Sequence, residues 1–240
     1  RVKALITGGA GFIGSHLVEG LLAKGYEVRV LDNFATGHRD NIKHLSDKIE
    51  LLEGDVCNLT TVRFAVKKVD VVFHQAALPS VPRSVKNPLE SNEVNIAGTL
   101  NVLLAARDEG IQRIVYASSS SVYGNQPSLP KEESMMPDPL SPYAIGKLTG
   151  ELYAKSFYLL YGLSTVSLRY FNVFGPRQDP TTQYAGAIAK FISCALEGKT
   201  FPVFGDGEQT RDFTYVSNVV EANIRAAESK IDGAPVLNIA

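Results

Sequence analysis

Short apolar runs rich in β-branched residues recur along the chain, and stretches with helical periodicity separate them. The apolar residues of 13–22 recur at the spacing of one helical face, and residues 100–106 and 148–161 behave similarly. The predicted strands are Val2–Thr7, Glu27–Leu31, Ile49–Leu52, Val69–His74, Arg113–Ala117, Ser164–Leu168 and Val236–Ile239. Alternating strands and helices predict an α/β fold, a doubly wound parallel sheet with helices on both faces.

Composition narrows the class of protein without pointing to a function. The 240 residues are 45% hydrophobic and 20% charged, which is typical of a globular domain and excludes disordered or collagen-like chains. A net charge of −1 gives no support to nucleic-acid binding or to an anionic membrane surface. No apolar run approaches the roughly 20 residues that span a bilayer.

The first residues and the cysteines indicate a compartment. Residues 1–7 have the pattern of a strand and not of a signal peptide. Cys57 and Cys194 lie far apart without Cys-x-x-Cys spacing, which is typical of buried free thiols in a reducing cytosol. We therefore expect a cytoplasmic protein that binds neither nucleic acid nor membrane.

A glycine-rich turn follows the first predicted strand. It carries Gly8, Gly11 and Gly14, with a further Gly9, and a predicted helix follows directly. Without side chains, the backbone amides can approach a pyrophosphate, and the helix dipole favours the anion. The strand before the turn and the helix after it supply the context that a lone glycine pattern lacks. The turn therefore predicts a dinucleotide site.

Carboxylates at the ends of the next two strands extend this prediction. Asp32 ends the second strand, where it can accept hydrogen bonds from a ribose diol and would repel a 2′-phosphate, so NAD is favoured over NADP. Asp55 and Val56 follow the third strand, where an adenine contact is expected, although Asp after a strand is also a common helix cap. The alternative is a structural turn with a solvated Asp32, but glycines, strand, helix and acid all agree.

A serine run and a Tyr-x-x-x-Lys pair form the second constellation. The fifth strand leads into Ser118–Ser121, and Tyr143 and Lys147 lie one turn apart at the start of a predicted helix. The ordinary pKa of a phenol is near 10. A Lys ammonium and an oxidised nicotinamide would lower the pKa of Tyr143 and make it a base near pH 7. Each part alone is common on protein surfaces; their order after a dinucleotide turn favours catalysis.

These residues resemble the extended short-chain dehydrogenase/reductase superfamily, and within it the UDP-hexose 4-epimerase family. Further marks are His74–Ala77, Val94–Thr99, Leu168–Arg177 and Gly205–Phe213. The resemblance covers essentially the whole chain. It implies a Rossmann NAD-binding domain over residues 1–170 and a sugar-nucleotide-binding region over 171–240. That smaller region interleaves with the last strands, and the resemblance implies that part of it lies beyond residue 240.

The resemblance also implies the role of each site residue. Ser119, Tyr143 and Lys147 would be catalytic, with Ser118 the nearest rival of Ser119. Cofactor contacts would come from Gly8, Gly11, Phe12, Ile13, Gly14, Asp32, Asn33, Thr36, Gly37, Asp55, Val56, Ala76, Ala77, Asn95, Tyr143, Lys147 and Phe171. Substrate contacts would come from Ser119, Tyr143, Asn172 and Arg211. A guanidinium such as Arg211 suits a diphosphate. No metal ion is expected.

The reaction follows from what the serine run lacks. Similar 4,6-dehydratases carry an Asp-Glu pair there and decarboxylases a Glu, whereas this chain has Ser120 and Ser121. We therefore expect inversion at C4 of a UDP-hexose of the UDP-glucose/UDP-galactose type, through transient oxidation to a 4-keto sugar. UDP-glucuronate or UDP-N-acetylhexosamine epimerisation, and a non-catalytic NAD-binding role, stay open. Helices at 88–107 and 141–161 are expected to pair in a homodimer.

Overall fold

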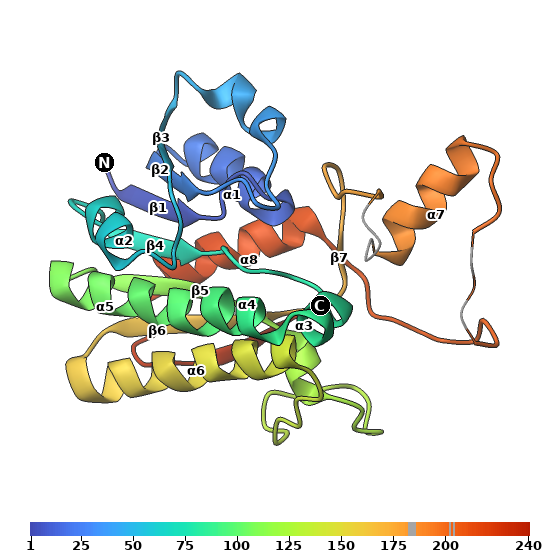
Figure 1. The fold of residues 1–240 in the computed structure, drawn as a ribbon. Helices are drawn as coiled ribbons and strands as arrows, with labels where there is room; N and C mark the ends of the chain where they lie inside the picture. The colour runs from blue at the N-terminus through green and yellow to red at the C-terminus, as the bar shows by residue number, and fades with distance from the viewer. Residues whose placement is uncertain (182–185, 202, 204) are drawn as a thin grey trace.

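A 7-stranded sheet forms the centre of the protein, in the order β3-β2-β1-β4-β5-β6-β9 (Figure 1). The computed structural model describes residues 1–181, 186–201, 203 and 205–240. All adjacent strands are parallel. The order reverses between β1 and β4, which is where doubly wound sheets open a crevice for ligands. The predicted fold class is confirmed.

The observed strands match the predicted runs, with small differences at their ends. They are β1 Lys3–Thr7, β2 Glu27–Asp32, β3 Ile49–Glu53, β4 Val71–His74, β5 Arg113–Ser119, β6 Ser164–Tyr170 and β9 Val236–Ile239. β5 and β6 run two residues further than predicted, because Ser118 pairs with Arg169 and Ser119 with Tyr170. Polar residues at the end of β5 hide the strand from a hydrophobic pattern, and they place Ser118 at the crevice with Ser119 next in the chain.

Helices cover both faces of the sheet. On one face lie α1 (Phe12–Ala23) and α8 (Val216–Glu228), and on the other α2 (Leu59–Ala65), α5 (Thr99–Glu109) and α6 (Pro142–Tyr161). The three predicted helices correspond to α1, α5 and α6. The apolar runs alone do not predict α8, whose buried face includes the polar Asn223.

Short elements connect the crevice to these helices. After β4 come α3 (Val81–Lys86), α4 (Pro88–Asn92) and a π-helical turn η3 (Glu93–Gly98) that leads into α5. The 3-10 turns are η1 (Arg39–Asn41), η2 (Lys43–Leu45) and η4 (Ser120–Tyr123). Each of α3 and α4 follows a side-chain cap, Ser80 and Asn87 respectively, and has a proline among its first two residues.

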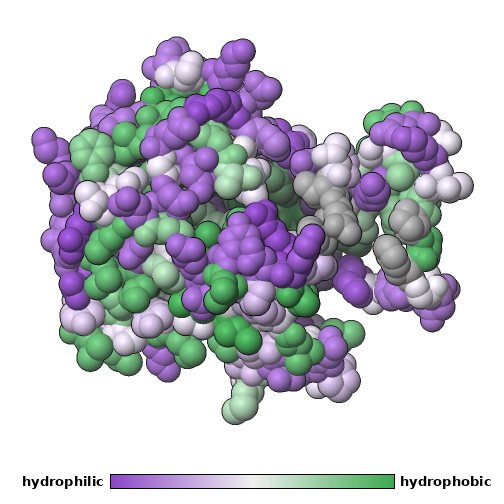
Figure 2. Space-filling view, viewed as in Figure 1, coloured by the Kyte–Doolittle hydropathy of each residue, from purple (hydrophilic) through white to green (hydrophobic). Residues whose placement is uncertain are grey.

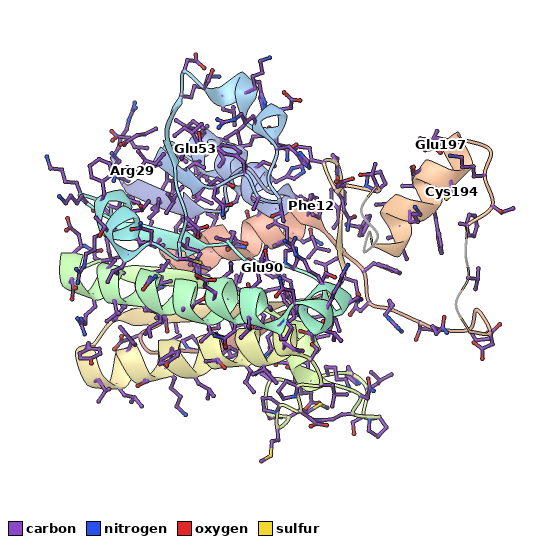
Figure 3. All side chains as sticks on the ribbon, viewed as in Figure 1. Phe12, Arg29, Glu53, Glu90, Cys194 and Glu197 are labelled. Carbon is purple, nitrogen blue, oxygen red and sulfur yellow. The ribbon has the colours of Figure 1, made fainter. Side chains whose placement is uncertain are left out.

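A long excursion, residues 175–213, leaves the sheet after β7 (Val173–Phe174) and returns to β8 (Thr214–Tyr215). β7 and β8 pair in parallel as a 2-stranded sheet at its neck. Within it α7 (Ala187–Leu196) stands to the right of the sheet in Figure 1, and Figure 3 labels Cys194 and Glu197 on it.

Both cysteines are free thiols, as the sequence predicts. Cys194 is buried, but Cys57 is only half-buried, so the expectation of burial is wrong for Cys57. It lies at the crevice, with its Sγ 3.7 Å from the Glu93 carbonyl oxygen. In the part of the chain that the structure describes, no helix is long and apolar enough to cross a bilayer.

Candidate active site

A cavity of about 1240 Å³ lies at the carboxyl ends of the central strands. Its volume exceeds the roughly 300–1,000 Å³ of ordinary small-molecule sites, as a dinucleotide with a second ligand requires. The predicted site residues that line it are Gly8, Gly11, Phe12, Ile13, Gly14, Asp32, Asn33, Thr36, Gly37, Asp55, Val56, Ala76, Ala77, Tyr143 and Lys147. The cofactor residues and the catalytic pair therefore share one cavity.

The glycines of the first turn serve different purposes. A Cβ on Gly14 would lie 2.1 Å from the Gly8 carbonyl oxygen, and one on Gly8 would lie 2.7 Å from the Ala76 nitrogen, so the backbone itself requires both glycines. A Cβ on Gly11 would meet only the Gly8 oxygen, at 3.2 Å, and Gly11 borders the cavity. Gly11 is also the N-cap of α1 and has no side chain to occupy the first amides. This cradle fits a pyrophosphate.

Asp32 is held as a preformed acceptor. Its Oδ2 accepts from the Ala10 nitrogen at 2.8 Å and its Oδ1 from the Phe34 nitrogen at 2.8 Å. Burial raises the pKa of Asp32, and the two backbone donors oppose that effect. Nearby, the Asn33 side chain donates to Asp55 Oδ2 at 2.7 Å. The carboxylate therefore keeps a fixed position at the cavity, where it suits the ribose diol of NAD.

Tyr143 and Ser119 lie within hydrogen-bond reach of each other. Ser141 caps α6 by accepting from the Ala144 nitrogen at 3.1 Å, which fixes the first turn that carries Tyr143. Burial raises the pKa of Tyr143, and a hydrogen bond with Ser119 lowers it. In the chain by itself desolvation outweighs the hydrogen bond, and the lowering of this pKa by a bound nicotinamide stays a prediction. Ser118, the rival serine, instead donates to Glu151.

Lys147 is buried beside Tyr143. Its Nζ donates to the Ala117 carbonyl oxygen at 2.7 Å and lies 5.9 Å from the centre of the Tyr143 ring. Burial lowers the pKa of Lys147 to about 7, and the charge of Glu151 opposes this. Near neutral pH, Lys147 therefore exchanges readily between its protonated and neutral forms.

A buried histidine supports the floor of the site. His74 contacts Thr7 Oγ1 through Nδ1 at 2.7 Å and Thr99 Oγ1 through Nε2 at 3.0 Å. Burial lowers its pKa to about 3, so the imidazole is neutral. Thr7 Oγ1 in turn accepts from the Ala76 nitrogen at 3.2 Å. These bonds connect β1, β4 and α5, and they hold the backbone of Ala76, which lines the cavity.

Two predicted cofactor residues lie behind the cavity wall. Asn95 is buried, and its side chain bonds both backbone groups of Leu78, to the nitrogen at 2.8 Å and the carbonyl at 3.1 Å. Phe171 packs against Tyr123, with ring centres 6.2 Å apart. Both hold segments that line or border the cavity, and a direct contact with cofactor stays a prediction for each.

The predicted substrate residues of the excursion side lie apart from the catalytic pair. Neither Asn172 nor Arg211 is among the described residues that line the cavity. Asn172 donates to the Asp212 carbonyl at 2.8 Å, and Arg211 is exposed and bonds the Thr210 carbonyl at 2.7 Å. The wall on this side is instead formed by Tyr170, Gln178, Asp179 and Gly186.

Several residues of the site are not predicted from the sequence. Gln75, Tyr170 and Asn223 form a hydrogen-bonded cluster with bonds of 2.8–3.2 Å that joins β4, β6 and α8. Ser80 lines the cavity with a positive φ of 99°, which is unusual for a residue other than glycine. Only the proline-rich loop around Ser80 gives a signal in the sequence.

The cavity, with a dinucleotide cradle at one end and the Tyr143–Lys147 pair at the other, is that of a short-chain dehydrogenase-like enzyme, although Ser119 is not among the described residues that line it. Residues 4–240 match the NAD dependent epimerase/dehydratase family, and the chain belongs to it.

Its relatives include several sugar-nucleotide enzymes. It is 44% identical over 228 residues to a putative UDP-glucose 4-epimerase of Methanocaldococcus jannaschii, covering 94% of this chain and 73% of the relative. The solved UDP-N-acetylglucosamine 4-epimerase of Methanobrevibacter ruminantium M1, in complex with UDP-N-acetylmuramic acid, is 43% identical with a TM-score of 0.96, over 100% and 76% of the chains. The Thermus thermophilus UDP-glucose 4-epimerase complex with NAD is 40% identical with a TM-score of 0.91, over 100% and 78%.

Proposed function

We propose that this protein is an NAD-dependent UDP-hexose 4-epimerase of the UDP-glucose/UDP-galactose type. The observation that carries the proposal is a single cavity bordered by Gly11 and Asp32 at one end and by Tyr143 and Lys147 at the other. Relatives named as UDP-glucose 4-epimerases support the same reaction. We assign cofactor binding to residues 1–170 and the sugar nucleotide to residues 171–240 with the serine run.

The first half of the mechanism is binding and orientation. The amides at the start of α1 would hold the pyrophosphate, and Asp32 would accept the ribose hydroxyls. NAD, when bound, supplies reversible oxidation at the sugar C4. Asn172 and Arg211 would hold the substrate diphosphate, which requires the excursion to approach the cavity.

Proton transfer is the task of Tyr143. Its phenolate oxygen would take the proton of the C4 hydroxyl, directly or through Ser119 Oγ, and return it after the 4-keto sugar has turned over. Lys147 would stabilise the phenolate by its charge. Ser120 and Ser121 offer no acid or base for a following elimination, so inversion is the expected outcome.

A second candidate substrate is a UDP-N-acetylhexosamine. The N-acetylglucosamine 4-epimerase relative has a TM-score of 0.96 over the whole chain, and it supports a site of this shape. A UDP-glucuronate substrate would need a cation for its carboxylate. Arg83 and Lys86 line the cavity, but Arg83 Nη2 already lies 3.3 Å from Glu90 Oε1. Because Lys86 stays available, the ranking of the neutral hexoses above the uronic acid rests on the relatives named UDP-glucose 4-epimerase.

The test is a substrate panel on the full-length protein with UDP-galactose, UDP-N-acetylglucosamine and UDP-glucuronate. Conversion of UDP-galactose to UDP-glucose supports the proposal. Release of a 4-keto-6-deoxy sugar, or the absence of any conversion, would overturn it. NADH fluorescence after addition of sugar nucleotide separates an enzyme from a non-catalytic NAD-binding protein, in which bound cofactor would stay oxidised.

We also propose a cytoplasmic homodimer that pairs through α4 and α6. Ile145, Leu152 and Leu159 recur at heptad spacing on α6 and are exposed, as is Leu89 on α4. Figure 2 shows apolar residues at the lower left, over α5 and α6. Sedimentation should give a dimer that Leu152→Lys converts to monomer, with exposed Ile192→Lys on α7 as the control. A monomeric wild-type protein would contradict this proposal.

A further inference from the structure

A buried ion pair lies directly behind the catalytic lysine. Arg169 on β6 donates to Glu151 on α6 through Nε at 2.9 Å and through Nη2 at 2.7 Å. Both side chains are 4% exposed. A two-pronged pair of this kind has fixed geometry, and removing one partner leaves an uncompensated buried charge.

Glu151 lies one helical turn beyond Lys147, so the two side chains share a face of α6. They form hydrogen bonds with consecutive residues of β5, since Lys147 donates to the Ala117 carbonyl and Glu151 accepts from the Ser118 hydroxyl. Gly150 permits this close approach, because a Cβ there would lie 2.2 Å from the Tyr116 hydroxyl. Glu151 is thus attached to the strand end that carries the catalytic serine.

The other arm of Arg169 extends the connection. Its Nη1 donates to the Tyr123 hydroxyl at 2.8 Å, and that hydroxyl donates to the Asn238 side chain at 2.7 Å. Tyr123 belongs to the turn that continues the serine run. The pair therefore joins α6, β5, β6 and β9 at the end where the cavity lies.

The charges around Lys147 single out Glu151. Among the residues that the structure describes, the titratable or charged groups around Lys147 and Tyr143 are His74 on β4, Tyr116 on β5, Tyr143 and Glu151 on α6, and Arg169 and Tyr170 on β6. His74 is neutral, and burial raises the pKa of each of the three phenols. Among these groups Glu151 supplies the negative charge that favours the Lys147 ammonium.

We propose that Glu151 is a positioning residue for catalysis: held by Arg169 and Ser118, its carboxylate keeps Lys147 protonated and in place beside Tyr143. This role rests on the proposed function, since it matters for turnover only where Tyr143 acts as a base. Arg169 fixes the carboxylate and limits its charge. The pair is then an electrostatic support for the reaction as well as a structural contact.

The experiment compares Glu151→Gln with Glu151→Gln/Arg169→Gln, which removes both charges. Lysine-selective ¹⁵N NMR, assigned with Lys147→Met, follows protonation of the Lys147 amine directly and needs no turnover. We expect the titration midpoint of Lys147 to fall by about one pH unit in Glu151→Gln, a tenfold weaker proton affinity, and by less in the double variant. The basic limb of the kcat profile should move in the same order.

Glu221→Gln is the matched control, since Glu221 forms an exposed ion pair with Arg225 on α8. It should leave both midpoints unchanged. An unchanged Lys147 midpoint in Glu151→Gln would overturn the proposal, whatever happens to kcat. If Glu151→Gln does not fold, an unchanged midpoint in the double variant would overturn it equally. The NMR result is independent of epimerase activity, so failure of the proposed reaction is seen separately.

Discussion

The residues that the sheet presents to the cavity are held more firmly than those on the side of the excursion. Asp32, Ser118 and Lys147 are each less than 10% exposed and hydrogen-bonded to neighbouring elements. Asn172 and Arg211 are exposed, and their side chains bond the backbone carbonyls of Asp212 and Thr210. The difference teaches that the residues proposed to bind the cofactor are fixed by the sheet, whereas the position of those proposed to bind the substrate depends on how the excursion is held.

The largest effect on activity should follow from a substitution among the residues that the sheet presents to the cavity, provided that it leaves the fold unchanged. Tyr143→Phe removes the proton acceptor without changing shape, and loss of a general base lowers kcat by about 10²–10⁴-fold. Steady-state assays with UDP-galactose measure this. Unchanged thermal stability serves as the internal control. A kcat within a few-fold of the wild-type value would show that another group moves the proton.

Substitutions at two glycines of the first turn distinguish the effect of backbone packing on stability from the effect of the cradle on NAD binding. Gly14→Ala forces a methyl group to 2.1 Å from the Gly8 oxygen, so we expect a loss of about 3 kcal/mol of stability together with NAD binding. Gly11→Ala should weaken NAD binding with little loss of stability, since its Cβ has nearly enough room. Urea unfolding and NAD titration measure the pair. Equal losses of stability in both variants would contradict the assignment of Gly14 to backbone packing and of Gly11 to the pyrophosphate cradle.

The pH dependence of stability tests the burial of Lys147. Its pKa is lowered to about 7, so the folded protein releases a proton that the unfolded chain keeps up to about pH 10. The cost of burying the ammonium is therefore full below pH 7 and disappears as the pH rises toward 10. Lys147→Met should be less destabilising at pH 6 than at pH 9, by on the order of 2 kcal/mol.

Urea unfolding at the two pH values measures this difference, and Lys155→Met, at an exposed position of the same helix, is the control. The opposite order, with the greater destabilisation at pH 6, would mean that Lys147 is stabilised as an ammonium in the fold.

The smallest effect is expected where the excursion leaves the sheet. Arg177 contacts Glu19 and His16 on α1 and the Asn41 carbonyl, and the next residue, Gln178, lines the cavity. Arg177→Ala should cost about 1 kcal/mol of stability, as partly exposed pairs do, and should raise the KM for sugar nucleotide more than it lowers kcat. Arg225→Ala on α8 is the control. An unchanged KM would show that this contact does not hold the substrate half.

Much of the sheet half can be predicted from the sequence, because its signals are local. The turn at residues 8–14, Asp32 and the Tyr143–Lys147 pair each combine with an adjacent strand or helix. Glu151 and Arg169 could not be recognised, since an ion pair between a helix and a strand leaves no spacing in the sequence. The same holds for Asn223 on α8, whose partners Gln75 and Tyr170 lie just after β4 and on β6.

For the excursion, the sequence predicts which residue types suit the substrate, but it does not predict where those residues lie. Arg211 suits a diphosphate chemically, but nothing in its neighbourhood fixes where a loop residue lies. α7 carries apolar residues that a pattern could find, but no pattern indicates that this helix stands away from the sheet (Figure 1). Tertiary contacts decide these positions.

The small parallel pair of β7 and β8 brings the two ends of the excursion together. Val173 is opposite Thr214, and Phe174 is opposite Tyr215. The length of a segment whose two ends are paired in this way can change at little cost to stability, because the entropy of closing a loop grows only slowly with its length. Insertions, deletions or wholesale grafts between these two short strands should be tolerated by the Rossmann body. If residues 171–240 bind the sugar nucleotide, as we propose, such changes should alter the sugar preference and leave NAD binding unchanged.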